Sequence, residues 1–206
     1  MSKLIFIAIL AILVIVNTSH AQESSIDGID ARSNPSDFAK QLNSSDPLVR
    51  QRSAEALARL AATDQRKLVE GYQLQEKNKE VRLALDWALY RMGHAEALYR
   101  IVGALDSGRQ EQAIGYLSEL ESPDVLYPFL KRDNNAPRIN AGLLKALART
   151  GDAQTLELIK PFLVSHQTYV AEAAEIAHDE IEKRLAEPAS AIRARPRTVE
   201  KAADRP

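Results

Sequence analysis

A thirteen-residue segment, Val81–Gly93, recurs along the chain at a nearly constant spacing. It reads Val-Arg-Leu-Ala-Leu-Asp-Trp-Ala-Leu-Tyr-Arg-Met-Gly, and weaker copies begin at residues 49, 109, 139 and 170. The five starts are 32, 28, 30 and 31 residues apart. A period near 30 residues, built from helical patterns, is typical of a solenoid in which each repeat packs on its neighbours. This feature restricts the chain to a repeat architecture.

Each copy follows another amphipathic segment, so the predicted repeat unit is a pair of helices. The preceding segments span residues 38–42, 66–75, 96–105, 125–131 and 155–164. Asp46-Pro47 has the residue types of a helix start, while Gly93 and Gly151 stand where helices are expected to end. Aromatic residues make up only 5% of the chain, which favours helices over a β-sandwich. We predict an all-α fold, a right-handed α-solenoid of about five antiparallel helix pairs over residues 36–186.

The two best copies carry a resemblance to a known repeat. The motifs are Asp46-Pro47-Leu48-Val49-Arg50 with Ala54, Ala56, Leu57 and Leu60, and Asn78-Lys79-Glu80-Val81-Arg82 with Ala84, Ala88, Leu89 and Gly93. This pattern resembles HEAT repeats, in particular the short PBS-lyase HEAT-like kind. The third copy departs most, because Arg109 and Gln110 replace its Val-Arg pair. The resemblance implies an interaction scaffold whose second helices line a concave face.

The second copy has two apolar faces where the repeat requires one. The expected core face consists of Val81, Leu85, Ala88, Leu89 and Met92. Leu83, Trp87 and Tyr90 form a second stripe at spacing i, i+4, i+7, where neighbouring copies have small or polar residues. One interpretation buries this stripe, either because the array curls tightly or because the N-terminal lead-in folds over it. The other makes it an exposed anchor for a protein partner, in which case Trp87→Ala would abolish partner capture with little loss of stability. We predict Leu83, Trp87 and Tyr90 as the partner-binding residues.

The chain begins with the pattern of an export signal. Lys3 precedes an apolar run of 13 residues, Leu4–Val16, and Ser19-His20-Ala21 offers a cleavage site before Gln22. We expect residues 1–21 to be a signal peptide, residues 22–35 a flexible lead-in and residues 187–206 a disordered tail. The mature protein would then be periplasmic or secreted, with no integral membrane segment.

The sequence contains no recognisable catalytic motif. Cysteine is absent, and His94, His166 and His178 suit capping or solvated positions better than catalysis. Arg50 and Arg82 share one repeat position and could bind an acidic partner, although pairing with nearby acids, such as Asp86 for Arg82, is the simpler interpretation. A net charge of −1 argues against nucleic-acid binding.

We therefore expect no catalytic residues, no cofactor and no metal site. The predicted function is that of a non-catalytic scaffold or adaptor that holds a protein partner on the concave face. The alternatives are a chaperone or regulator of an envelope enzyme, and a lyase-type enzyme related to the phycobilin lyases that share this repeat.

Overall fold

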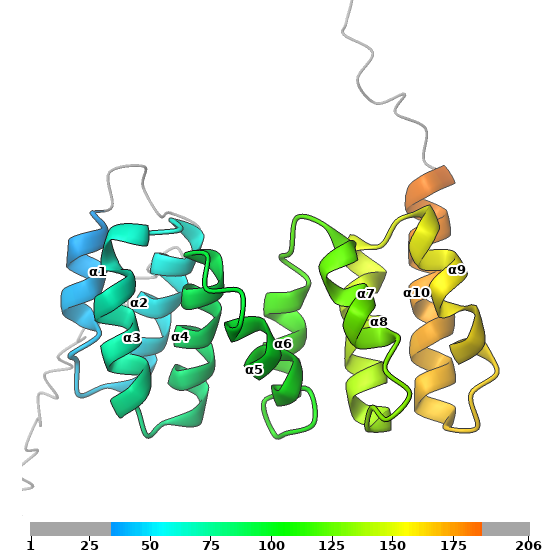
Figure 1. The fold of residues 1–206 in the computed structure, drawn as a ribbon, viewed down its shortest axis with the longest axis horizontal. Helices are drawn as coiled ribbons and strands as arrows, with labels where there is room; N and C mark the ends of the chain where they lie inside the picture. The colour runs from blue at the N-terminus through cyan, green and yellow to red at the C-terminus, as the bar shows by residue number, and fades with distance from the viewer. Residues whose placement is uncertain (1–33, 187–206) are drawn as a thin grey trace, which may run out of the picture. The chain divides into compact units, whose positions relative to one another are not determined.

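The computed structural model describes residues 34–186, and this range contains ten α-helices and no strand (Figure 1). The first helices of the five pairs are α1 (Pro35–Gln41), α3 (Arg66–Gln75), α5 (Ala97–Ala104), α7 (Tyr127–Leu130) and α9 (Ala153–Leu163). The second helices are α2 (Pro47–Arg59), α4 (Lys79–Arg91), α6 (Gln110–Leu117), α8 (Pro137–Thr150) and α10 (Thr168–Ala186). Short 3₁₀ turns, η1 (Thr63–Gln65) and η2 (Pro123–Leu126), precede α3 and α7. The predicted signal peptide and tail, and nearly all of the lead-in, lie outside the described residues.

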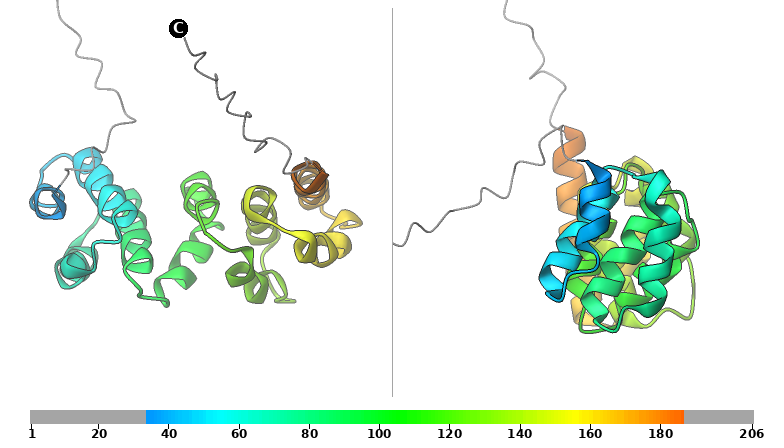
Figure 2. Two further views of the ribbon diagram at one scale, coloured as in Figure 1. Left: turned by 90° about the horizontal axis from the view of Figure 1, so that it is seen from above. Right: turned by 90° about the vertical axis from the view of Figure 1, so that its left-hand side faces the viewer.

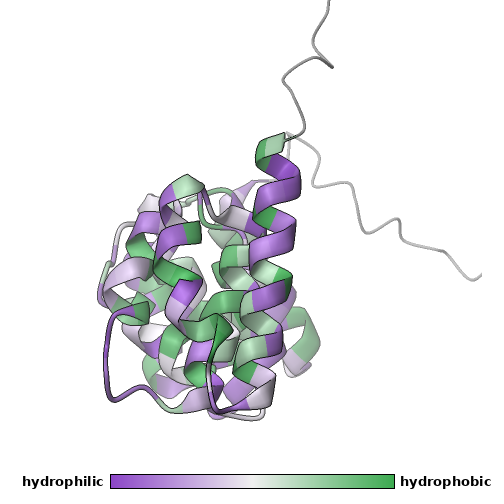
Figure 3. Ribbon diagram, turned by 90° about the vertical axis from the view of Figure 1, so that its right-hand side faces the viewer, coloured by the Kyte–Doolittle hydropathy of each residue, from purple (hydrophilic) through white to green (hydrophobic). Residues whose placement is uncertain are grey.

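The helices pack pairwise in a solenoid-like arrangement, which confirms the predicted fold class. Figure 2 shows the second helices in one layer, with α3, α5, α7 and α9 in another. None of the helices between residues 34 and 186 combines the length and the hydrophobicity that a membrane span requires. Each second helix therefore needs only one apolar face toward its partners. Figure 3 shows the resulting alternation of hydrophobic and hydrophilic residues along α10.

Helix starts follow the local signals in the sequence. Asn34, Asp46 and Asn78 each accept a hydrogen bond from a backbone N–H of the first turn, at 3.0, 2.9 and 3.0 Å. Asp152 begins α9 with a reciprocal capping box to Thr155. These caps satisfy amides that would otherwise lack a partner at the helix ends. The predicted start of α2 at Asp46-Pro47 is confirmed.

The two predicted C-terminal glycines act for different reasons. Gly93 follows α4 with φ of 91°, a left-handed conformation that favours glycine. Gly151 ends α8 in an extended conformation instead. A Cβ atom at Gly151 would lie 2.5 Å from Ile181 Cδ1 and 2.6 Å from the Leu147 carbonyl oxygen. Gly151 is therefore required by the close approach of α10, and not by a left-handed turn.

Packing between successive second helices is uneven along the array. Helix α2 packs extensively on α4, and α8 packs extensively on α10, whereas α4 and α6 make few contacts. Helix α6 has 8 residues, against 13 in α4 and 14 in α8. The third repeat, which departs most from the sequence pattern, is thus also the shortest in its second helix. We call the region where α4 faces α5 and α6 the α4–α6 seam.

Candidate functional site

Trp87 lies inside the α4–α6 seam and is not an exposed anchor. Its side chain is 2% exposed, and Leu83 on the same stripe is 4% exposed. The Trp87 ring stacks on Tyr116 of α6, with centroids 5.5 Å apart and an interplanar angle of 2°. It also stacks on Tyr90, at 5.7 Å, and the Arg91 guanidinium lies 5.6 Å from its centroid. The expectation that Trp87→Ala would leave stability nearly unchanged is therefore wrong, because the substitution would empty a packed interface.

The side chain that covers Trp87 comes from the next repeat. At the repeat position of Tyr116, the other four copies have Ala56, Ala88, Ala146 and Ala177. At the position of Trp87, the third copy has Gly115. Two large aromatic rings thus fill the space between α4 and α6, where alanines allow closer packing of the other repeats. Sequence reasoning missed Tyr116, although the substitution in the alanine column was visible once the copies were superposed.

Tyr116 also connects the third repeat to the first. Its hydroxyl donates to Glu55 Oε1 on α2 at 2.7 Å and accepts from Gln112 Nε2 at 2.8 Å. Burial, reinforced by the negative charge of Glu55, raises the pKa of Tyr116 well above its ordinary value. The phenol therefore remains protonated and acts as a donor at physiological pH. Helices α2, α4 and α6 are held together by this one side chain.

Each of the three predicted binding residues borders a different hollow. Trp87 forms part of the wall of a hollow of about 260 Å³ that also includes Glu55, Gln112 and Tyr116. Leu83 borders one of about 360 Å³, and Tyr90 borders the largest, of about 500 Å³. The apolar stripe on α4 is thus mostly buried, yet it lies beneath a row of openings along the seam. Whether Leu83, Trp87 and Tyr90 take part in partner binding stays a prediction.

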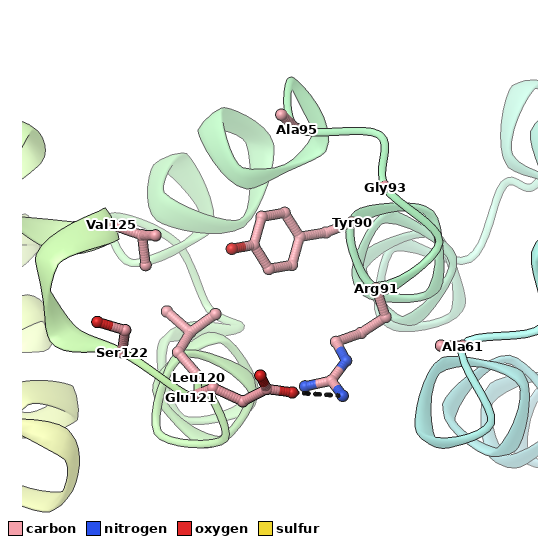
Figure 4. A pocket seen from close by; sticks show the side chains of 9 residues that line it. All are labelled: Ala61, Tyr90, Arg91, Gly93, Ala95, Leu120, Glu121, Ser122 and Val125. Carbon is pink, nitrogen blue, oxygen red and sulfur yellow. Dashed lines mark ion pairs between the residues drawn. The ribbon is translucent and has the colours of Figure 1, made fainter.

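The hollow beside Tyr90 has the best-formed walls, and we call it the Tyr90 hollow. Its lining consists of Ala61, Tyr90, Arg91, Gly93, Ala95, Leu120, Glu121, Ser122 and Val125. Figure 4 shows the Tyr90 ring extending from α4 toward Val125 and Leu120, beside the ion pair of Arg91 with Glu121. The nitrogen and oxygen of that pair are 3.5 Å apart. Burial raises the pKa of Tyr90, so its hydroxyl also remains protonated.

The composition of the Tyr90 hollow suits recognition better than catalysis. It has an apolar wall, one aromatic ring and a charged rim, which is the composition of a protein-binding hot spot. Its volume falls within the usual range for ligand sites, which is roughly 300–1,000 Å³. Within residues 34–186, no group of three or more metal-ligating side chains is clustered. His94 lies outside this lining and is 3.6 Å from a carboxylate oxygen of Glu70.

The two arginines at the shared repeat position have structural roles at Glu76. Arg50 donates to both carboxylate oxygens of Glu76, at 2.7 and 3.0 Å, and this pairing lowers the pKa of Glu76. Arg82 donates to the Glu76 backbone carbonyl, through Nε at 3.0 Å and also through a second nitrogen. Asp86, the expected partner of Arg82, instead accepts hydrogen bonds from Arg100 and Gln73. The prediction of local acid pairing is confirmed for Arg50, while Arg82 keeps its charge without a paired carboxylate.

Comparison with known proteins identifies the repeat in the N-terminal part of the array. Residues 35–114 match the family model described as HEAT repeats. This range includes both copies that carry the resemblance, and the narrower PBS-lyase-like subtype stays a prediction. No curated protein matches the chain. Among solved structures, the crystal structure of an engineered protein is similar at 16% identity, covering 73% of this chain and 97% of the other, with a TM-score of 0.30.

Proposed function

We propose that the protein is an exported, non-catalytic scaffold or adaptor that binds a protein partner over the α4–α6 seam. The observation that carries this proposal is the Tyr90 hollow, in which a half-buried aromatic ring borders about 500 Å³ beside a charged rim. HEAT repeats, which the family model matches over residues 35–114, generally serve as protein-interaction scaffolds. Export is proposed from the signal-peptide pattern of residues 1–21.

The seam suggests a division of roles among the three predicted residues. Tyr90 is the side chain that a partner would touch, because it is only partly buried and its ring faces the hollow. Leu83 and Trp87 would hold α4 and α6 at the separation that keeps the hollow open. A partner side chain of moderate size, inserted beside Tyr90, would be desolvated on several sides. Such central, water-excluded contacts dominate the binding free energy of protein interfaces.

The proposal can be tested by filling the hollow without removing any of its contacts. Ala95 is exposed and lines the Tyr90 hollow, so Ala95→Trp places a large ring in the space that the partner would occupy. Ala186 is also exposed, at the last residue of α10, and Ala186→Trp serves as the matched control. Both variants should keep the melting temperature of the wild type, because neither alanine is buried.

The assay is affinity capture from an envelope extract with the wild type and both variants. We expect the wild type and Ala186→Trp to retain a stoichiometric protein partner, and Ala95→Trp to lose at least nine-tenths of it. Equal capture by Ala95→Trp would place the partner elsewhere on the array. Co-purification of a small molecule or pigment, with no protein partner, would contradict the scaffold function itself.

A further inference from the structure

The hollow beside Leu83 differs from the others in its charge, and we call it the basic hollow. Lys79 and Arg82 come from α4, Arg100 from α5, and Arg109 directly precedes α6. Four cationic side chains therefore line a space of about 360 Å³, with a single carboxylate, Asp86, among them. The chain as a whole has a net charge of −1, so this concentration of positive charge is local.

The one carboxylate in the basic hollow is already paired. Asp86 is 5% exposed and accepts from Arg100 Nε at 2.6 Å and from Gln73 Nε2 at 3.0 Å. Burial raises the pKa of Asp86, and the Arg100 hydrogen bond partly offsets this effect. Asp86 and Arg100 thus satisfy each other at the base of the hollow. The charges of Lys79, Arg82 and Arg109 are left over.

Those three cations are uncompensated within residues 34–186. No described carboxylate lies within ion-pair distance of their charged nitrogens. Arg82 is held in place by the neutral Glu76 carbonyl, which fixes its position without neutralising its charge. Arg109 is partly buried, and therefore less free to move into solvent. Fixed guanidinium groups lose less conformational entropy on binding an anion than free ones do.

The space between these cations is open and partly apolar. Leu83 is buried beneath it, and nothing lies within 4 Å of the point where a Cβ atom of Gly103 would stand. An anion that enters would relieve the repulsion among the three cations and would form charge-assisted hydrogen bonds with guanidinium groups. The size of the hollow suits one or two side-chain carboxylates, whereas a nucleic acid needs cations that track many phosphates.

We propose that the basic hollow binds a carboxylate side chain from an acidic segment of the protein partner. This inference rests on the proposed scaffold function and adds the chemistry of the partner. The basic hollow and the Tyr90 hollow both border α4 and share no lining residue. A partner that lies along the seam would place an acidic residue beside Leu83 and a bulky residue beside Tyr90. Electrostatic attraction would then set its orientation and its rate of association.

The test uses the purified protein and a rhodamine-labelled octapeptide that contains four glutamates, with a glutamine peptide of the same length as control. Fluorescence anisotropy at low ionic strength should show at least tenfold tighter binding of the glutamate peptide. The affinity should fall as salt is added, because the interaction is between charges near the surface. Equal binding of the two peptides would overturn the proposal.

Two isosteric variants separate charge from shape. Gly103→Glu and Gly103→Gln both fill the basic hollow, and only Gly103→Glu supplies a carboxylate to its cations. We expect Gly103→Glu to weaken glutamate-peptide binding at least tenfold more than Gly103→Gln does. Equal weakening by both would show that charge does not direct binding. Arg109→Gln, which leaves α5 unchanged, should also weaken binding about tenfold, and unchanged binding would overturn the proposal even if the Gly103 variants fold poorly.

A competition experiment distinguishes an acidic peptide from a free anion. Inorganic phosphate, added at matched ionic strength, should displace the glutamate peptide no better than sodium chloride does. Preferential displacement by phosphate would assign the hollow to a small free anion and overturn the peptide proposal. These outcomes are separate from the capture experiment with Ala95→Trp. The Tyr90 hollow can bind a partner even if the basic hollow does not.

Discussion

Replacing Trp87 by alanine should cost most of the stability of this helical array. An aromatic side chain buries about 150–250 Å² in a core, and at about 25 cal/mol per Å² this area corresponds to about 4–6 kcal/mol. Because Trp87 is 2% exposed, nearly all of that contribution applies. Measured aromatic-to-alanine substitutions in cores cost about 3–5 kcal/mol, since the surrounding structure relaxes only in part. We expect a loss of about 4 kcal/mol, against a typical domain stability of about 5–15 kcal/mol.

The assay is urea denaturation followed by far-ultraviolet circular dichroism. Trp87 is the only tryptophan, so the variant cannot be followed by tryptophan fluorescence. Trp87→Phe retains an aromatic ring and should lose less stability than Trp87→Ala. A double-mutant cycle with Tyr116→Ala should show a coupling of about 0.5–1.5 kcal/mol, which is the usual contribution of a stacked aromatic pair beyond its buried area.

The burial of Trp87 would be refuted by a small effect. A loss below about 1 kcal/mol is typical of substitutions at exposed positions. That result, together with a coupling to Tyr116 near zero, would mean that the rings do not pack on each other. The wild type offers an independent check, because a buried indole emits at shorter wavelength than one in water. Emission typical of a solvated indole would contradict the packing at the seam.

Two further predictions concern other parts of the array. Gly151→Ala should cost about 1–3 kcal/mol because its Cβ would overlap Ile181, whereas Gly115→Ala, which has open space, should gain about 0.5–1 kcal/mol in urea denaturation, and equal effects would contradict the packing at α10. The Arg50 hydrogen bonds lower the pKa of Glu76 in the folded state, so their stabilisation is present above the ordinary glutamate pKa of about 4.3 and is lost as the pH falls below it. Glu76→Gln should therefore be less stable than the wild type at pH 7 and should lose less stability between pH 5 and pH 3; parallel pH profiles would show that Glu76 is not linked to folding.

Features that depend on neighbouring residues could be predicted from the sequence. The start of α2 follows from Asp46-Pro47, and the start of α4 follows from the Asn78 cap, because each signal acts within one turn of the helix. The five helix pairs follow from a period that fixes which faces must be buried. The core face of α4 was predicted for the same reason, and Val81, Leu85 and Leu89 are buried as expected.

Features that depend on distant residues were beyond this reasoning. The burial of Trp87 depends on Tyr116, which is 29 positions later in the chain, and the periodicity of α4 alone contains no information about that ring. The partner of Asp86 is a similar case. Arg82 at i−4 was the local choice, but Arg100 on α5 lies closer because the turn after α4 brings α5 against it. Local spacing shows which pairs can form, and tertiary packing decides which do form.

The irregular repeat explains why the proposed binding surface lies at this position in the array. A regular solenoid packs each second helix on the next through alanines, and such contacts leave little space between them. Tyr116 replaces one of those alanines, and the stack with Trp87 fills the centre of the interface while α6 remains too short to fill its ends. The Tyr90 hollow and the basic hollow border α4 beyond the two ends of that stack, at Tyr90 and Leu83. The aromatic stripe therefore acts through separation, since the same rings that stabilise the seam keep two openings of different chemistry available to a partner.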